Sequence, residues 1–281
     1  MDYGTVSNQT LVMLGIGAVI FLVVPIIIAI IWKKKKKEPF TTILIGAATF
    51  LLFVTVEKVI QSFFIADFNP LGTFINARPV LWAFVVGFFP GLFEETGRLV
   101  AFKTLLRKRN QRETSISYGL GHGGIGEVSV FMTYTMIVYV LYAFMINSGE
   151  IKTIVDQVRE LSPSQLSQIE EAIRQLTEFT PMYLLTMIIE RVFAVLFHTG
   201  ASIMVFYACK DKKFWLYPLA IVFHTLIDML GGLMLANVIS IPGWAFEVFF
   251  AAASSLIFFG AYFLLYRKDT PETVPEIGEE V

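Results

Sequence analysis

Seven apolar runs, each long enough to cross a bilayer, decide what this chain can fold into. A helix that spans the hydrocarbon core needs about 20 predominantly apolar residues. The runs lie at residues 9–32, 41–66, 80–102, 116–146, 181–208, 214–237 and 243–266. Hydrophobic residues make up 56% of the 281 residues and the mean hydropathy is +0.67, a composition unlike that of soluble domains. We therefore expect an all-α fold, a polytopic membrane helix bundle of about seven transmembrane helices, occupying residues 1–268.

Basic residues predict which way this bundle points. The connections after the first, third, fifth and seventh runs hold fifteen lysines and arginines, whereas the other connections hold four. Positive charge collects on the cytoplasmic side of membrane proteins, so we expect the N-terminus outside and the C-terminus in the cytoplasm. The first run is expected to remain as an anchor rather than act as a signal peptide, because Lys33–Lys37 follow it directly.

The longest connection, residues 147–180, falls on the predicted outer side and carries an amphipathic pattern. Ser162 and Pro163 form a typical helix start. Apolar residues then recur at helical spacing: Leu166, Ile169, Ile173 and Leu176. We expect an amphipathic helix that lies over the outer mouth of the bundle. The acidic tail, residues 269–281, is expected to be a disordered cytoplasmic end.

All three histidines of the chain, His122, His198 and His224, lie within the apolar runs. Ionisable groups are costly in a bilayer and usually face a protein interior or a wet cavity. At 1.5 Å of rise per residue, these histidines and the adjacent Glu94 and Glu95 lie roughly 9–16 Å inside the predicted cytoplasmic ends of their spans. Four helices therefore bring titratable groups to one layer. This layer predicts a chemical site that is open to the cytoplasmic half of the membrane.

Residues three or four positions apart on the same helix can pair with members of this layer. Arg98 follows Glu95 by three residues and Glu94 by four, so one of the two carboxylates can pair with it on the same helix face. The carboxylate that stays unpaired is a candidate general base, and the spacing leaves open which one that is. Asp228 follows His224 by four residues and can orient the imidazole. Taken alone, each spacing is equally compatible with a purely structural contact.

The fourth run opens with five glycines in eight residues, around His122 and next to Glu127. Each glycine weakens a helix by about 1 kcal/mol relative to alanine, but it lets another helix approach closely, as at Gly119 and Gly123. Close packing explains the glycines but not the histidine and the glutamate among them.

Two further pairs of adjacent, oppositely charged residues lie nearer the predicted outer side, Glu57 with Lys58 and Glu190 with Arg191. The equal numbers of each sign predict interhelical ion pairs. Glu190 lies two helical turns from His198 and can also extend the candidate site.

These elements resemble the CAAX-protease and bacteriocin-processing superfamily of intramembrane proteases, and within it the YhfC-like membrane peptidases. The resemblance covers most of the chain, from the third run to the sixth. It rests on the following elements: Glu94, Glu95 and Arg98; His122 in His-Gly-Gly; Glu190 and Arg191 ahead of His198; and His224 with Asp228. The chain departs from the first superfamily motif in having two residues, instead of three, between the glutamate pair and the arginine.

The resemblance implies that a glutamate-activated water hydrolyses a peptide bond of a membrane-associated protein or peptide. The catalytic residues would be Glu94, Glu95, His122, His198, His224 and Asp228, and the supporting residues Arg98, Glu127 and Glu190. One glutamate and His122 would activate the water, and the other two histidines with Asp228 would position it or stabilise the oxyanion. The location would be the bacterial cytoplasmic membrane, as a multi-pass protein.

The sequence does not decide between the absence of a cofactor and a divalent metal such as zinc. His122, His198 and His224 would be the ligands of such a metal, because imidazoles are common zinc donors. The chain has no His-Glu-x-x-His motif.

A transporter or ion-coupled membrane protein is the main alternative, in which the same layer relays protons or binds a cation. Many transporters carry paired repeats with broken helices, and the single glycine-rich run has no counterpart here. Haem binding would use two histidines and leave the third and the acids unexplained. The net charge of −1 does not favour nucleic acid. We therefore expect the partners to be the lipid bilayer and a membrane-embedded or membrane-associated peptide substrate.

Overall fold

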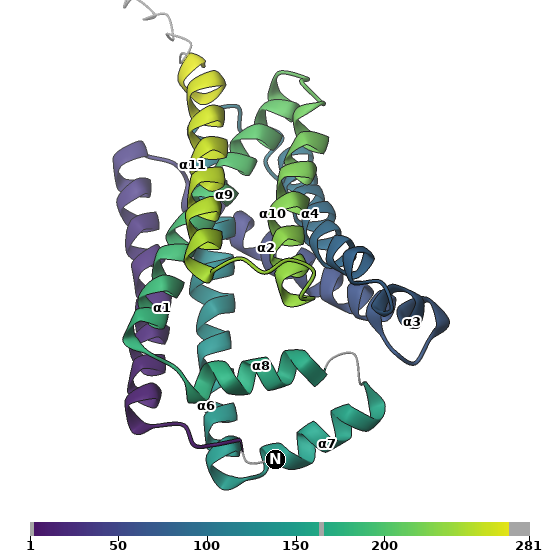
Figure 1. The fold of residues 1–281 in the computed structure, drawn as a ribbon. Coiled ribbons are helices and arrows are strands. Elements are labelled where there is room, and N and C mark those ends of the chain that lie inside the picture. The colour runs from purple at the N-terminus through teal and green to yellow at the C-terminus, as the bar shows by residue number, and fades with distance from the viewer. Residues whose placement is uncertain (1–2, 163–165, 270–281) are drawn as a thin grey trace, which may run out of the picture.

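The structure, a computed structural model, describes residues 3–162 and 166–269, and all their regular secondary structure is helical (Figure 1). Seven helical segments are long and apolar enough to cross a membrane. They are α1 (Asn8–Lys36), α2 (Phe40–Ile65), α4 (Pro79–Lys103), the segment Glu113–Ser148, α9 (Pro181–Lys210), α10 (Leu216–Leu235) and α11 (Gly243–Leu264), which continues through η3 (Tyr266–Lys268). The predicted helix bundle and its seven spans are confirmed.

Three shorter helices connect the spans at one end of the bundle. They are α3 (Pro70–Asn76), α7 (Ile151–Leu161) and α8 (Leu166–Thr177). The N-terminal segment lies at the same end, where the backbone N–H of Val6 donates to Asn147 Oδ1 at 2.7 Å (Figure 1). We call this the α7–α8 end. The opposite end, which carries Lys33–Lys37 and Asp269, is called the basic end.

The amphipathic helix expected in the connection 147–180 is present as α8. Its Ile173 and Leu176 are buried against α1, α6 and α9 residues in one apolar cluster. The connection also contains a second amphipathic helix, α7, which was not expected from the sequence. Pro163 of the predicted helix start lies outside the described residues.

Helix α4 packs closely on α10 because glycines remove side chains from the contact. A Cβ at Gly87 would lie 2.5 Å from the backbone nitrogen of Met229, and one at Gly91 would lie 2.7 Å from Thr225 Oγ1. Pro90 leaves the carbonyl of Val86 without its helical donor. Gln61 Nε2 of α2 donates to that carbonyl at 3.4 Å. The close approach brings the glutamates of α4 to the histidine of α10.

The span Glu113–Ser148 changes its winding midway. It begins as α5 (Glu113–Gly119), continues as the π-helix η1 (Leu120–Met132) and ends as α6 (Thr133–Ser148). In a π-helix the backbone bonds join residues five apart, whereas an α-helix would place such residues about 140° apart around its axis. The wider winding therefore turns His122 and Glu127, five apart, toward the same neighbour.

Two apolar clusters occupy the two ends of the bundle. The cluster at the α7–α8 end joins α1, α6, α7, α8 and the start of α9. The cluster at the basic end joins the ends of α4, α9 and α11 with α5 and the start of α10, and it includes Phe102, Tyr118 and Phe206. We call this second cluster the basal plug. The titratable layer lies directly beside it.

Asp269, the last described residue, is attached to the basic end. Its carboxylate accepts a hydrogen bond from Tyr207 at 2.7 Å and pairs with Lys210, and its backbone carbonyl accepts one from Arg112 at 2.8 Å. The rest of the predicted disordered tail, residues 270–281, lies outside the described residues.

Candidate functional site

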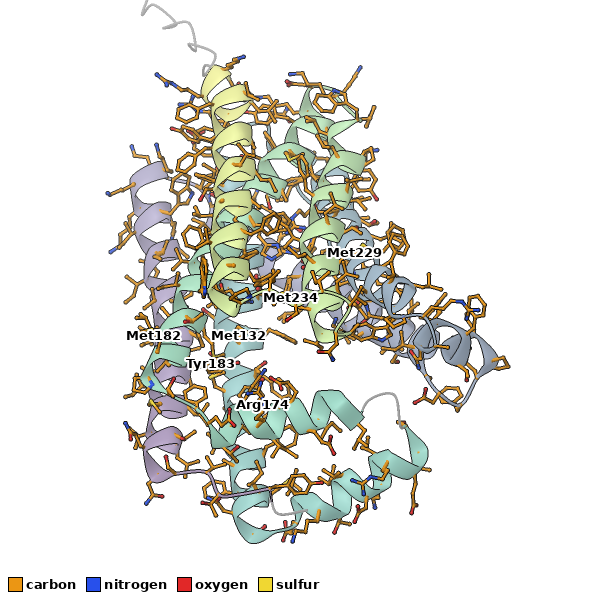
Figure 2. All side chains as sticks on the ribbon, in the orientation of Figure 1. Met132, Arg174, Met182, Tyr183, Met229 and Met234 are labelled. Carbon is orange, nitrogen blue, oxygen red and sulfur yellow. The ribbon has the colours of Figure 1, made fainter. Side chains whose placement is uncertain are left out.

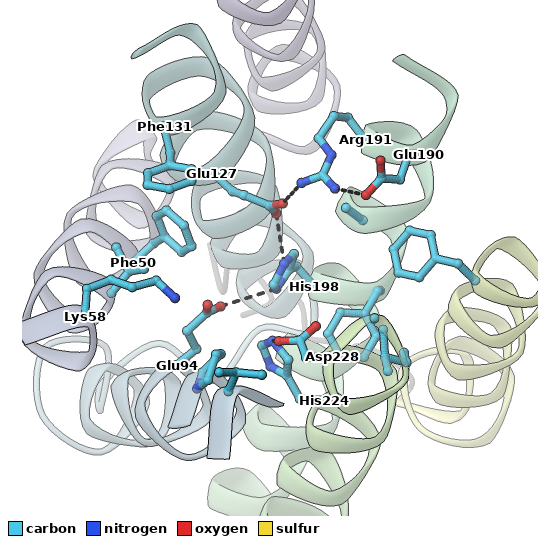
Figure 3. A pocket seen from close by; sticks show the side chains of 18 of the residues that line it. Phe50, Lys58, Glu94, Glu127, Phe131, Glu190, Arg191, His198, His224 and Asp228 are labelled. Atoms are coloured by element: carbon cyan, nitrogen blue, oxygen red, sulfur yellow. Dashed lines mark hydrogen bonds and ion pairs between the residues drawn. The ribbon is translucent and has the colours of Figure 1, made fainter. Parts of the chain in front are cut away.

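A cavity of about 340 Å³ enters the bundle beside the buried histidines (Figure 3). Its lining comes from α2, α4, η1, α9, α10 and α11. The charged and imidazole side chains in the lining are Lys58, Glu94, Glu127, Glu190, Arg191, His198, His224 and Asp228. The remaining wall is mainly apolar, with Phe50 and Phe131 on one side. A polar cluster at the bottom of an apolar cavity is the usual form of a small-molecule or catalytic site.

Glu94 faces this cavity and contacts an imidazole behind it. His122 Nε2 lies 3.0 Å from Glu94 Oε2. The His122 ring is enclosed by Phe50, Tyr118 and His198, and its Nδ1 is buried without a hydrogen-bond partner among the described residues. Oε1 of Glu94 carries no hydrogen bond from any described residue. Glu94 therefore keeps one oxygen for a group in the cavity while the other is oriented by His122.

Glu95 has a different environment. Its side chain is fully buried, and Oε1 accepts a hydrogen bond from Arg98 at 2.5 Å and contacts His224 Nδ1 at 2.9 Å. Arg98 is also fully buried, and its Nε donates to Ser202 Oγ at 3.2 Å. Glu95 thus neutralises the buried guanidinium of Arg98 and holds the imidazole of His224 on α10. It does not line the cavity.

Arg98 fixes the proton position of a second histidine. Its Nη2 lies 2.6 Å from His198 Nδ1, and because a guanidinium can only donate, this ring nitrogen accepts. Nε2 then carries the proton and faces Glu127 Oε2 at 2.8 Å. His198 Nδ1 lies 3.7 Å from Glu94 Oε2. His198 therefore stands between Glu94 and a supporting carboxylate, with its tautomer set by two neighbours.

Glu127 continues this chain of contacts toward the cavity mouth. Its Oε1 accepts a hydrogen bond from Arg191 Nη1 at 2.6 Å, and Arg191 also pairs with Glu190 (Figure 3). At the other end, His224 Nε2 lies 3.5 Å from Asp228, a looser contact than its bond to Glu95. A continuous series of polar contacts therefore runs from Glu190 through His198 and Arg98 to Asp228.

The structure brings all nine residues predicted for the site into this cluster. The three imidazoles follow one another, with ring centroids 5.2 Å apart for His122 and His198 and 5.5 Å apart for His198 and His224. Ser202, which accepts from Arg98 and donates to the carbonyl of His198 at 2.7 Å, was missed. Its spacing of four residues from His198 was the signal that could have revealed it.

Two expectations require correction. Glu57 and Lys58 do not bridge helices but pair with each other at 3.2 Å, because they are sequence neighbours. The interhelical ion pair of this region is Arg191 with Glu127. The expected opening is also wrong in direction: the cavity extends from Glu94 toward the α7–α8 end and not toward the basic end.

Comparison with known proteins identifies the chain's relatives. A family model described as "YhfC intramembrane metalloprotease" matches residues 14–250. The chain belongs to the YhfC family. It is 27% identical over 228 residues to the "Uncharacterized membrane protein YhfC" of Bacillus subtilis (strain 168), covering 80% of this chain and 84% of that protein. No solved structure matches the chain.

The name of the YhfC family implies a metal, and the buried side chains can be tested for one. Donor atoms of Glu94, His122 and His198 all lie within 4.8 Å of one another. Two imidazoles and one carboxylate form a donor set that catalytic zinc uses. His224 is not in this group, because its nitrogens face Glu95 and Asp228. The set fits a divalent metal by residue type and spacing, provided that the neighbouring guanidinium releases His198 Nδ1.

Proposed function

We propose that the protein is an intramembrane peptidase that hydrolyses a peptide bond of a membrane-associated polypeptide. The observation that carries this proposal is the position of Glu94. It lines a cavity inside the membrane bundle while one oxygen contacts His122 and lies near His198. The description of the matching family supports the same class of reaction.

The residues around the cavity have distinct roles in this proposal. A water beside Glu94 gives a proton to the carboxylate, and its oxygen adds to the peptide carbonyl carbon. The carbon–nitrogen bond then breaks, and the leaving amine takes the proton. His122 orients Glu94 from behind. His198, with its tautomer fixed by Arg98 and Glu127, and His224 with Asp228 position the water and the peptide.

Where a metal is present, Glu94, His122 and His198 would hold it. A bound divalent metal acidifies a coordinated water and polarises a carbonyl. Asp228 is then the carboxylate available to receive a proton, because it faces the cavity with no hydrogen bond shorter than 3.5 Å from the described residues. Both forms make Glu94, His122 and His198 essential, so the peptidase proposal does not depend on the metal.

The first test is cleavage by the purified protein in proteoliposomes with a bacterial membrane-protein fraction. We expect new peptide termini with the wild type and none with Glu94→Gln, whose folding is checked by its unfolding temperature. Metal content by mass spectrometry separates the two forms. About one metal per chain, lost in His122→Gln, supports the metal-dependent form. Cleavage that persists in a metal-free preparation would overturn that form while leaving the peptidase proposal standing.

Two broader assignments belong to the same proposal. We place the YhfC family within the CAAX-protease and bacteriocin-processing superfamily, because both share a glutamate pair and arginine on one helix and histidines on the helices that follow. We also place the protein in the bacterial cytoplasmic membrane, with the N-terminus outside. The relative in Bacillus subtilis and the basic residues at one end of the bundle support this location.

Ion transport by the same polar chain is the competing function. A transporter needs a pathway to both membrane faces, and the basal plug packs apolar side chains between the histidine layer and the basic end. Ion-uptake assays in proteoliposomes distinguish the two functions. Uptake that Glu94→Gln abolishes, in the absence of any cleavage, would favour the transporter.

A further inference from the structure

The cavity lies on one side of the titratable layer. Its lining residues on α4 come before Glu94 in the sequence, and those on α9 lead up to His198, so both sets lie toward the N-terminal ends of these helices, where α3 precedes α4 and α8 precedes α9. On α10, which runs in the opposite direction, the lining continues beyond His224 to Gly231. The α11 lining comes from its first two turns, at Phe246 and Phe250. All of these positions place the cavity between the site and the α7–α8 end.

On the other side of the layer the basal plug separates the site from a smaller cavity of about 180 Å³ at the basic end, whose lining includes Phe102 and Phe206 but no residue of the titratable layer. The basal plug contains the fully buried Tyr118 and the nearly buried Phe102 and Phe206, and the three aromatic rings contact one another in sequence, with Phe102 between the other two. Tyr118 also hydrogen-bonds Thr49 of α2 at 2.6 Å. A polypeptide arriving from the basic end would have to displace this core, whereas one arriving from the α7–α8 end meets an existing cavity.

Helix α8, at the α7–α8 end, is attached to one side of the bundle. The apolar face of α8 packs in the cluster of α1, α6 and α9, and Gln175 accepts a hydrogen bond from Tyr183 at 3.1 Å. In Figure 2, Arg174 of α8 and Met234 of α10 are drawn on opposite sides of a space, with α8 crossing below it. The helix therefore belongs to the α1, α6 and α9 side of the bundle, and none of its described residues lines the cavity.

The size of the cavity restricts what can enter. An α-helix with its side chains is about 10–12 Å across. A cavity of about 340 Å³ is therefore too small to hold an intact helical segment. An extended chain advances about 3.3 Å per residue and can lay a few residues beside Glu94. Scission in such a cavity requires a locally unfolded stretch of substrate.

We propose that substrates reach Glu94 from the α7–α8 end, as an extended polypeptide segment adjoining a membrane anchor. This inference rests on the proposed peptidase function for the nature of the substrate. The direction of access follows from the cavity and the basal plug. Since the basic residues predict that the α7–α8 end is outside, the substrate class is the outer juxtamembrane segment of an anchored protein.

Cysteine accessibility tests the direction without requiring any cleavage. Cys209 is the one cysteine of the chain and lies near the basic end of α9, so Cys209→Ser gives a cysteine-free background. In that background Gly231→Cys places a thiol in the cavity wall, where an added Cβ meets only Phe246, at 3.9 Å. Val86→Cys supplies a second position in the same wall, on α4 where it packs against α10.

The two faces of the membrane are marked by exposed residues. Lys152→Cys labels the α7–α8 end and Lys35→Cys the basic end. A charged, membrane-impermeant maleimide is applied to intact cells and to inverted vesicles. We expect Gly231→Cys and Val86→Cys to react from the same face as Lys152→Cys and to lose labelling from the face of Lys35→Cys. Reaction from the Lys35 face, or from neither face while the denatured protein reacts, would overturn the proposal.

The position of cleavage provides the second readout. Cleavage sites on the Lys152 side of substrate anchors support the proposed class. Sites on the Lys35 side would overturn the direction of access while leaving the peptidase function intact. Thiol labelling as expected without any cleavage would instead reject the function and keep the direction of access.

Discussion

At the residue scale, substitution of the two adjacent glutamates is predicted to affect different properties, cleavage for Glu94 and stability for Glu95. Glu94→Gln should lower cleavage by about 10²–10⁴-fold, the range of a lost general base, and leave the unfolding temperature unchanged. Glu95→Gln leaves Arg98 buried without its carboxylate, so it should lower the free energy of unfolding by about 3–5 kcal/mol. Thermal unfolding in detergent and a cleavage assay measure both. A stable Glu95→Gln beside an unstable Glu94→Gln would reverse the assignment.

Glu127 and Glu190 give a second matched pair of variants. Glu127 lies 2.8 Å from His198 Nε2 and accepts a hydrogen bond from Arg191, whereas Glu190 contacts Arg191. Glu127→Gln should reduce cleavage by about 10–100-fold, as removal of a supporting partner does, and Glu190→Gln should have a smaller effect. Equal losses in the two variants would mean that the contact with His198 has no role in positioning.

Which residues gather at this site could be predicted from the sequence, but which of them pair with one another could not. Spacing alone allowed Arg98 to pair with either glutamate, because both lie on neighbouring parts of one helix face. The choice depends on α10, whose His224 approaches Glu95, and that approach depends on the glycine contacts between α4 and α10. Long-range packing of this kind leaves no local signal.

At the element scale, the glycines of η1 are predicted to differ in their tolerance of alanine. A Cβ at Gly121 would lie 2.0 Å from the carbonyl oxygen of Ile43, so Gly121→Ala should cost about 1–3 kcal/mol of stability through overpacking. At Gly124 the nearest atom is Pro25 Cβ at 3.6 Å, an ordinary contact. Gly124→Ala should therefore be neutral or stabilise by up to about 1 kcal/mol. Unfolding temperatures of the two variants make the comparison, and equal destabilisation would contradict the packing account.

The turn between α1 and α2 carries a pH-dependent contribution outside the membrane spans. Burial raises the pKa of the Glu38 carboxyl above its usual value, against hydrogen bonds from Thr42 and Thr114 and the charge of Arg109. The folded state then binds the proton more tightly than the unfolded chain. This stabilisation is complete below the unfolded pKa and is lost as the pH rises through the folded pKa.

Glu38→Gln is predicted to remove that dependence. The wild-type unfolding temperature should decline from the ordinary glutamate pKa up to the raised one, and the variant should decline less over the same interval. Thermal unfolding across a pH series measures the difference. An unchanged slope in the variant would show that Glu38 is not the group responsible.

The π-helical winding of the fourth span is a feature that could not be predicted from the sequence. Hydropathy predicted a helix there, and the glycines correctly predicted close packing, which Gly119 and Gly123 make against α9. Neither property reports whether the backbone bonds join residues four or five apart. The π-helical winding, which turns His122 and Glu127 toward His198, depends on the packed neighbours.

At the scale of the whole molecule, hydropathy predicted the seven spans because an apolar environment forces every backbone group into a helix. The layer of ionisable groups followed from counting residues along those helices. The direction in which the cavity opens did not follow, because it depends on which end of the bundle is filled. Phe102, Tyr118 and Phe206 pack between the site and the basic end, and nothing in their sequence positions distinguishes them from lipid-facing residues.

The central claim is that Glu94 directs water onto a peptide bond. The most direct measurement is mass spectrometry of peptide termini after incubating reconstituted protein and membrane substrates in ¹⁸O-labelled water. With the wild type we expect new C-termini that carry ¹⁸O and lie beside membrane anchors, and with folded Glu94→Gln we expect these termini to disappear. Labelled termini that persist unchanged in Glu94→Gln, or their absence with a folded wild-type protein, would contradict it.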